Sequence, residues 1–172
     1  MTITFDDIPK FPRPAYEVDV PWIYIERKIE RMGEGPGGLD LDPDFQRAHV
    51  WTQNQQREFV EYQLMGGDVS RDITFNGPDF RRGGKATVVL LDGKQRLEAV
   101  RSFLRNELTV FGQTCKDFGR LPWMDYRFRF VVCELQSREE VLSLYLKINA
   151  GGTPHSAEEL ARVRRMLENA RE

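Results

Sequence analysis

The feature that most constrains the fold of this chain is an apolar run followed at once by a helical pattern. Residues 86–91 predict a buried strand, Asp92-Gly93 is a turn pair, and apolar residues at helical spacing predict a helix over residues 94–105. Such a strand-to-helix corner offers free backbone N–H groups and the positive end of a helix, which suit a bound anion, most often a phosphate. The polar residues of this corner are Asp92, Gly93, Lys94, Gln95 and Arg96.

Composition places the chain among soluble globular proteins. Its 172 residues suffice for one domain with a proper core, and no apolar run approaches the roughly 20 residues that a membrane helix needs. With a net charge of −2 the chain is not a generally basic nucleic-acid coat, so a polyanion site requires a local concentration of arginine and lysine. The N-terminus lacks the pattern of a signal peptide, and Cys115 and Cys133 form no CxxC pair. We therefore expect a cytoplasmic protein with reduced thiols and no membrane partner.

Prolines and periodic segments set the expected organisation. Three prolines within residues 1–20 exclude a regular helix, so this stretch is expected to be an extended N-terminal arm, on the surface or against a partner, ahead of a single domain over residues 21–172. Further strands are expected at residues 72–76 and 126–132, with a small hairpin near residues 109–115. Helices are expected from residues 21 and 94 and, behind capping boxes, from Thr52, Ser137 and Ser156. The expected fold class is α+β, a compact domain with a small mixed sheet flanked by helices.

The strand expected over residues 126–132 alternates between two faces. Phe128 and Phe130 would point to the core, and Arg127 and Arg129 to the opposite side, because successive side chains of a strand alternate. This pattern is typical of a strand that is buried on one face and exposed on the other.

A second Gln-Arg pair, Gln46-Arg47, lies in the irregular polar segment 41–51. Arginine presents a planar fork suited to bidentate phosphate contact, and glutamine orients either a phosphate oxygen or a water. Two such pairs on non-helical backbone suggest two walls of one pocket. A structural interpretation competes at both places: Arg96 would pair with a neighbouring carboxylate, and Gln46 and Arg47 would belong to a buried ion pair. The corner matches neither a Walker A loop nor a dinucleotide fingerprint.

Three stretches of the chain, in order and spacing, resemble one family. They are Asp44-Phe45-Gln46-Arg47 with Val50-Trp51, then Leu91-Asp92-Gly93-Lys94-Gln95-Arg96-Leu97, then Ile148-Asn149-Ala150-Gly151-Gly152-Thr153-Pro154. The chain resembles the ParB/sulfiredoxin superfamily, in the branch defined by a DGQQR motif. That branch is the N-terminal domain of GmrSD-type restriction enzymes and of related phage-defence proteins. The resemblance covers about residues 20–165.

The resemblance implies a compact ParB/sulfiredoxin-like fold whose strand-to-helix motif grips nucleotide phosphates. Carried over residue by residue, the predicted nucleotide-binding residues are Gly93, Lys94, Gln95, Arg96, Arg47, Asn149 and Gly152. The first four would grip the phosphates, Arg47 would close the opposite wall beside Gln46, and the last two would line the rim. The expected ligand or substrate is an NTP.

The resemblance also implies NTP hydrolysis that controls a nuclease, with Mg²⁺ as cofactor. The predicted catalytic residues are Asp92, Gln95 and Gln46, with Asp92 placing the corner or holding Mg²⁺ or a water. Lys94 replaces a glutamine of the family motif. It adds a charge for phosphate but removes an amide that would orient water, so it favours binding over hydrolysis. With Glu172 as its end the chain has no room for the His-Asn-His nuclease domain of GmrSD-type proteins, so any cutting is expected from the chain itself or from a nuclease or other defence partner.

A basic patch is a further candidate. Arg81, Arg82 and Lys85, with Arg101 and Arg105, would lie near the corner and contact the DNA backbone, or they would form an ordinary solvated surface. Three functions are consistent with the sequence. They are a nucleotide-binding domain that hydrolyses or senses NTP in phage defence, a non-enzymatic module that binds DNA or protein, and a ParB-like metal-dependent DNA nuclease.

Overall fold

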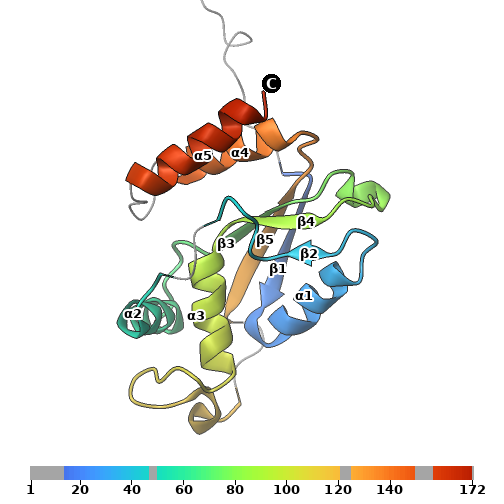
Figure 1. Ribbon diagram of the computed structural model, residues 1–172. Helices are drawn as coiled ribbons and strands as arrows, with labels where there is room; N and C mark the ends of the chain where they lie inside the picture. Colours follow the sequence, from blue (N-terminus) through green and yellow to red (C-terminus); the bar gives the residue numbers. More distant parts are fainter. Residues whose placement is uncertain (1–13, 47–49, 121–124, 150–156, 172) are drawn as a thin grey trace, which may run out of the picture.

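A mixed five-stranded sheet forms the centre of the protein in a computed structural model, which describes residues 14–46, 50–120, 125–149 and 157–171 (Figure 1). The strand order is β1-β5-β3-β4-β2. β1 pairs antiparallel with β5 and β3 antiparallel with β4, whereas the β3–β5 and β2–β4 pairs are parallel. The strands are β1 Tyr16–Pro21, β2 Leu39–Asp40, β3 Asp72–Asn76, β4 Val88–Asp92 and β5 Arg127–Cys133. The expected small mixed sheet flanked by helices is confirmed.

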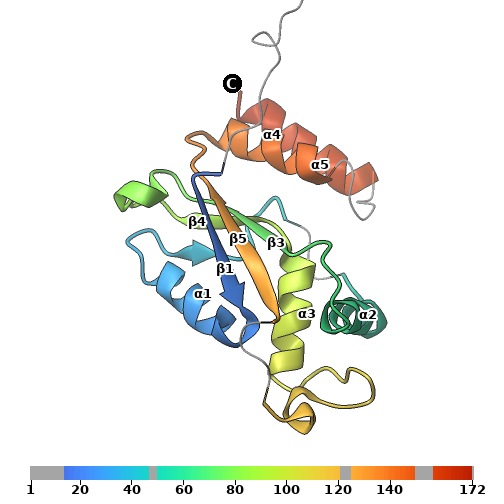
Figure 2. The same ribbon diagram turned by 180° about the vertical axis from the view of Figure 1, so that it is seen from behind.

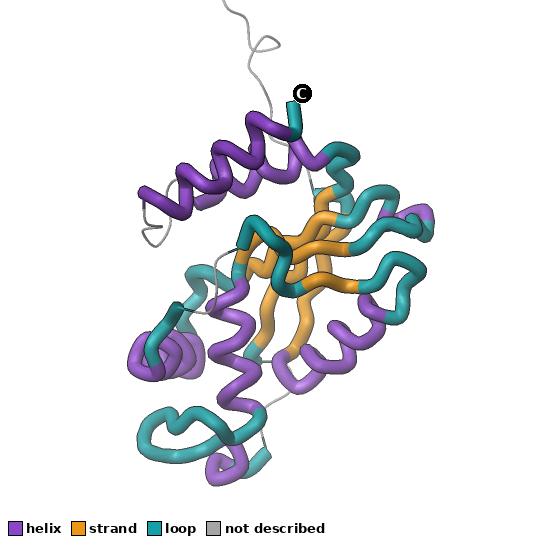
Figure 3. Tube along the Cα trace, viewed as in Figure 1, coloured by secondary structure: helices purple, strands orange, loops and turns teal. Residues whose placement is uncertain are grey.

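The helices gather in two groups around the sheet. α1, α2 and α3 pack against one face, and α4 and α5 lie side by side across one end of the sheet, an arrangement that Figures 2 and 3 also show. The helices are α1 Ile25–Gly33, α2 Gln53–Leu64, α3 Lys94–Leu104, α4 Arg138–Asn149 and α5 Ala157–Asn169. Short 3-10 turns are η2 Trp22–Tyr24, η3 Phe80–Arg82 and η4 Cys115–Phe118.

The main core lies between the sheet and α1, α2 and α3. Phe128 and Phe130 of β5 are fully buried in it, while Arg129 between them is exposed, so the predicted alternation of β5 is confirmed. The same parity places Arg127, Arg129 and Cys133 on the opposite face of the sheet. Several large aromatic side chains are buried here among aliphatic ones, and their burial stabilises the fold.

A second core lies under α4 and α5, on that opposite face. Phe45, Leu91, Cys133, Tyr145 and Val163 pack together there. The ring centroids of Phe45 and Tyr145 are 5.1 Å apart, in an edge-on contact. Because Cys133 ends β5, the helices cover this end of the face and leave the part around Arg127 and Arg129, near the start of β5, to solvent.

The local predictions hold in part. The capping box of Thr52 with Gln55 is present, and Ser137 exchanges hydrogen bonds with Glu140 at the start of α4, whereas Ser156 lies outside the described residues. Residues 16–20, expected in the extended arm, form most of the edge strand β1. The hairpin near residues 109–115 is reduced to a single bridge between residues 110 and 113.

Candidate functional site

The strand-to-helix corner has the predicted form. β4 ends at Asp92, Gly93 adopts a left-handed φ of +97°, and α3 begins at Lys94. A Cβ at residue 93 would lie 2.6 Å from Cδ1 of Ile73, and the left-handed backbone disfavours other residues as well. Glycine is therefore required here for two independent reasons, and it lets the first turn of α3 start directly at the end of the strand.

Two glutamines attach the segment before α2 to this corner. Gln46 donates from Nε2 to the backbone oxygens of Leu90 and Leu91, at 3.0 and 2.8 Å. Oε1 of Gln95 accepts from the backbone N–H groups of Val50 and Trp51, at 3.0 and 3.1 Å. The two motifs predicted to face each other are thus adjacent in the fold. Both glutamines use these atoms to hold backbone, and Arg47 lies outside the described residues.

Charged side chains fix the same segment from two further directions. Lys94 is only 16% exposed and forms an ion pair with Asp42. Arg162 of α5 donates to the backbone oxygens of Asp44, Phe45 and Gln46, at 2.9, 3.4 and 3.2 Å. No local pattern indicated the role of Arg162, because it is one of several arginines on a polar helix face. The segment before α2 is therefore bound both to the corner and to α5.

Arg96 points to the other side of the corner. Its Nη2 donates to Oδ2 of Asp92 at 2.5 Å and to the backbone oxygen of Asp72 at 2.9 Å. Its Nε is buried and has no hydrogen-bond partner among the described residues. Pairing of Arg96 with a neighbouring carboxylate, the structural interpretation, is therefore present. It does not exclude a binding role, because the guanidinium of Arg96 also borders open space.

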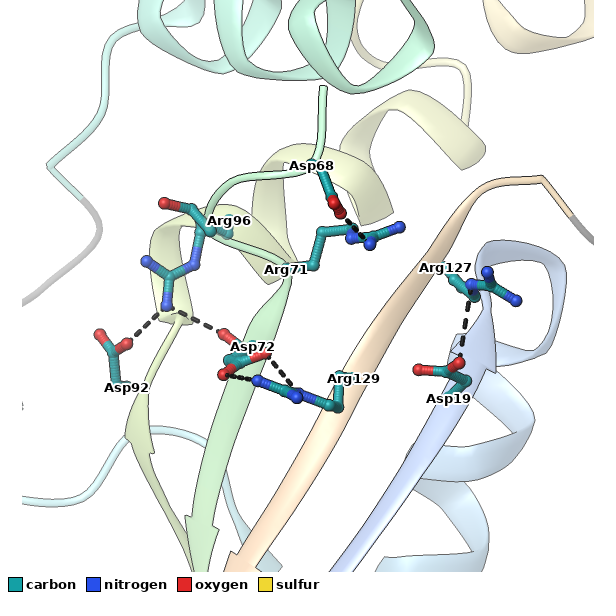
Figure 4. A pocket seen from close by; sticks show the side chains of 9 residues that line it. Asp19, Asp68, Arg71, Asp72, Asp92, Arg96, Arg127 and Arg129 are labelled. Atoms are coloured by element: carbon teal, nitrogen blue, oxygen red, sulfur yellow. Dashed lines mark hydrogen bonds and ion pairs between the residues drawn. The ribbon is translucent and has the colours of Figure 1, made fainter. Parts of the chain in front are cut away.

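That space is a charged cavity of about 710 Å³ on the open part of the sheet (Figure 4). Four strands and the corner contribute to it. Its lining residues are Asp19, Asp68, Ser70, Arg71, Asp72, Asp92, Arg96, Arg127 and Arg129. The sequence predicted only Asp92 and Arg96 as site residues. The outward direction of Arg127 and Arg129 was visible in the alternation of their strand, but nothing local indicated which strand would lie beside them.

Charges of the cavity are balanced, with four aspartates and four arginines. Arg129 binds Asp72 through Nε and Nη2, at 2.8 and 2.6 Å, and this hydrogen bonding raises the pKa of Arg129. Nε of Arg127 lies 3.6 Å from Asp19. Since Arg129 is half exposed, its ion pair contributes little to stability, and its guanidinium is available to a ligand at small cost.

The predicted basic patch does not lie at the corner. Arg81, Arg82 and Lys85 belong to the connection between β3 and β4, which is at the opposite end of β4 from Asp92. Arg81 donates to Glu134 from its backbone N–H and its guanidinium, which lowers the pKa of that carboxyl group. The predicted location of these three residues near the corner was wrong. They lie before the start of β4, whereas the corner follows its end. Binding of DNA by these residues stays a prediction.

The third motif is described only at its first part. Asn149 is the last residue of α4 and donates from Nδ2 to the backbone oxygen of Tyr145 at 2.8 Å. The ring of Tyr145, one turn earlier, packs against Phe45. Gly152 lies outside the described residues, so the predicted rim is seen only at Asn149. Among the described residues no group of three or more potential ligands gathers to hold a metal ion around Asp92 or elsewhere.

Comparison with known protein families, with curated proteins and with solved structures finds no match to this chain. The described residues contain no helix long and apolar enough to cross a membrane. The resemblance to the ParB/sulfiredoxin superfamily therefore stays a prediction.

Proposed function

We propose that this protein binds a nucleoside triphosphate as its Mg²⁺ complex, with the phosphates in the charged cavity beside the corner. The main support is that three further arginines line the same cavity as Arg96. The charged cavity contains this motif arginine together with Arg71, which directly precedes β3, and Arg127 and Arg129 of β5. Guanidinium groups are the side chains best shaped to bind phosphate oxygens in pairs.

The balance of charge favours a metal complex over a free anion. A purely cationic pocket attracts any anion, whereas equal numbers of aspartate and arginine side chains suit a ligand that carries both signs. Mg²⁺ is commonly held by one or two carboxylates together with phosphate oxygens, and not by a cage of protein ligands alone. The carboxylates that would hold the ion are those of Asp92, which binds Arg96, and Asp72, which binds Arg129.

Gln46 and Gln95 have a positioning role in this proposal. Their hydrogen bonds to backbone hold the segment that precedes α2 against the corner. The ligand would thereby be sensed by a segment that also contacts Arg162 of α5. In the phage-defence setting that the family resemblance implies, this link makes the chain an NTP-dependent switch for a nuclease partner. Hydrolysis is secondary to binding, because Lys94 replaces a motif glutamine.

The test is titration of the full chain with each Mg²⁺–NTP, followed by thermal melting. A ligand at 100 times its Kd stabilises the folded state by about 2.7 kcal/mol. Arg127→Ala and Arg96→Ala are expected to abolish this shift. Arg81→Ala, which also loses one exposed ion pair but lies outside the cavity, is expected to keep it.

Three results separate the competing functions. Stabilisation by an NTP in the wild type, lost in Arg127→Ala and kept in Arg81→Ala, supports the proposal. No shift with any NTP refutes it and leaves the non-enzymatic module. Metal-dependent nicking of plasmid DNA that is unaffected by Arg127→Ala and Arg96→Ala would favour the nuclease and separate cutting from the cavity.

A further inference from the structure

The outer edge of β1 is unpaired among the described residues. β1 ends the sheet and pairs only with β5. Arg129 of β5 donates its backbone N–H to the oxygen of Arg71, just before β3, and Trp22, just after β1, donates its N–H to the oxygen of Tyr126. Because the backbone groups of a strand alternate in direction, the N–H and C=O groups of Glu17 and Asp19 point away from β5. This edge offers hydrogen-bonding groups that a further strand would satisfy.

A groove of about 320 Å³ runs beside this edge, between β1 and α1. Its apolar floor comes from Val18, Val20 and Pro21, with the half-exposed ring of Tyr24 beside them. Its basic wall comes from Arg27, Lys28 and Arg31 of α1. The groove thus combines an open strand edge with a row of positive charge.

Two of these cations lack partners. Arg27 and Arg31, one helical turn apart, make no hydrogen bond or ion pair with any residue that the structure describes. Lys28 is held, since its Nζ lies 3.3 Å from the hydroxyl of Tyr16 and 5.1 Å from the centroid of that ring. Each arginine of the charged cavity, by contrast, contacts an aspartate. Unneutralised charge beside a free strand edge is a feature of a surface that binds an acidic chain.

We propose that the edge of β1 binds an extended acidic segment of a partner protein, which adds a strand to the sheet. Side chains of the added strand would alternate between two environments. On the α1 side they would meet Arg27 and Arg31, so acidic residues fit there. On the other side they would lie beside Glu17 and Asp19, so uncharged residues fit there. The ligand is therefore acidic at every second position, and its paired length is short because Pro21 offers no N–H.

The experiment uses the full chain and a labelled, capped hexapeptide in which glutamate alternates with threonine, followed by fluorescence anisotropy. Two control peptides replace glutamate by lysine or group the three glutamates together. We expect the alternating acidic peptide to bind about tenfold or more tightly than either control, because only it places three negative charges on the α1 side. Its affinity is also expected to fall as salt is added.

Matched variants locate the site. Arg27→Glu/Arg31→Glu is expected to weaken binding about tenfold or more, and neither side chain has a structural partner to lose. Arg164→Glu/Arg165→Glu makes the same change of charge on the exposed side of α5 and is expected to leave binding unchanged. Hydrogen exchange should show new protection of the Glu17 and Asp19 amides when the peptide binds.

Several outcomes would overturn the proposal. They are no binding of the acidic peptide, equal binding of the lysine peptide, and equal loss in both charge-reversed pairs. Protection of the Glu17 and Asp19 amides in the free chain would show that this chain or a second copy already occupies the edge. The groove and the charged cavity share Asp19, but Arg27 and Arg31 line the groove alone. Loss of peptide binding in their charge-reversed variant is therefore distinct from loss of nucleotide binding.

Discussion

Replacing Gln95 by alanine should detach the segment before α2 from the corner. Gln95 is 8% exposed, and its Oε1 is the acceptor for the N–H groups of both Val50 and Trp51. Each buried backbone donor that loses its acceptor costs about 1–3 kcal/mol, less where water reaches it. Because Val50 is about half exposed and Trp51 is only partly buried, water reaches these donors, and we expect a loss of about 1–3 kcal/mol in the free energy of unfolding.

Urea unfolding and amide exchange together measure this effect. The exposed Gln136, whose amide donates to a backbone oxygen, serves as the matched control, and Gln136→Ala is expected to cost less than about 0.5 kcal/mol. In Gln95→Ala the amides of Val50 and Trp51 should exchange much faster, while those of β5 follow only the global loss of stability. Unchanged exchange at Val50 and Trp51, or a cost no larger than that of Gln136→Ala, would refute the bracing role of Gln95.

Three further predictions test the fold around the site. Gly93→Ala should lower the free energy of unfolding by about 1–3 kcal/mol in urea melts, because residue 93 has a left-handed φ and a Cβ there would contact Ile73 of β3. An unchanged free energy of unfolding would contradict the requirement for glycine at this position. Two backbone hydrogen bonds hold the pKa of Glu140 below its ordinary value, the larger effect coming from the N–H of Ser137 and the smaller from the N–H of Gln136. Stability from Glu140 is therefore complete above the ordinary carboxyl pKa and lost as pH falls through the lowered one, so melts of wild type and Glu140→Gln should differ near neutral pH and converge in acid. Cys133 is only 4% exposed, and its burial raises the pKa of its thiol. A thiol reagent should therefore modify Cys115 first and Cys133 only on unfolding. Equal rates of modification in the folded protein would be inconsistent with the burial of Cys133.

Local signals in the sequence were enough for most elements. The corner was predictable because an apolar run, an Asp-Gly pair and a helical stripe follow one another directly, and β4 and α3 have nearly the predicted bounds. The alternation of β5 and the capping box of α2 are equally local, and both are confirmed. Gln46 and Gln95 both join the segment before α2 to the corner, whereas the pocket predicted between the two Gln-Arg pairs stays a prediction.

Features that depend on the order of strands were not predictable. Arg71, Arg127 and Arg129 share a cavity with Arg96 only because β3 lies between β4 and β5. β1 was missed because the prolines before it outweighed a short alternation of valine with acidic residues. Gln46 and Gln95 were predicted to be catalytic. Their hydrogen bonds to backbone depend on partners distant in the sequence, which no local pattern reveals.

Hydrogen exchange of the full chain with and without each Mg²⁺–NTP tests the central claim most directly. Binding in the charged cavity predicts slower exchange in the first turn of α3, after Asp92, and along β5 near Arg127 and Arg129 for at least one NTP. Arg127→Ala should lose this protection and Arg81→Ala should retain it. Exchange that no NTP changes, or protection confined to residues away from the corner and β5, would contradict the assignment of the cavity as a nucleotide site.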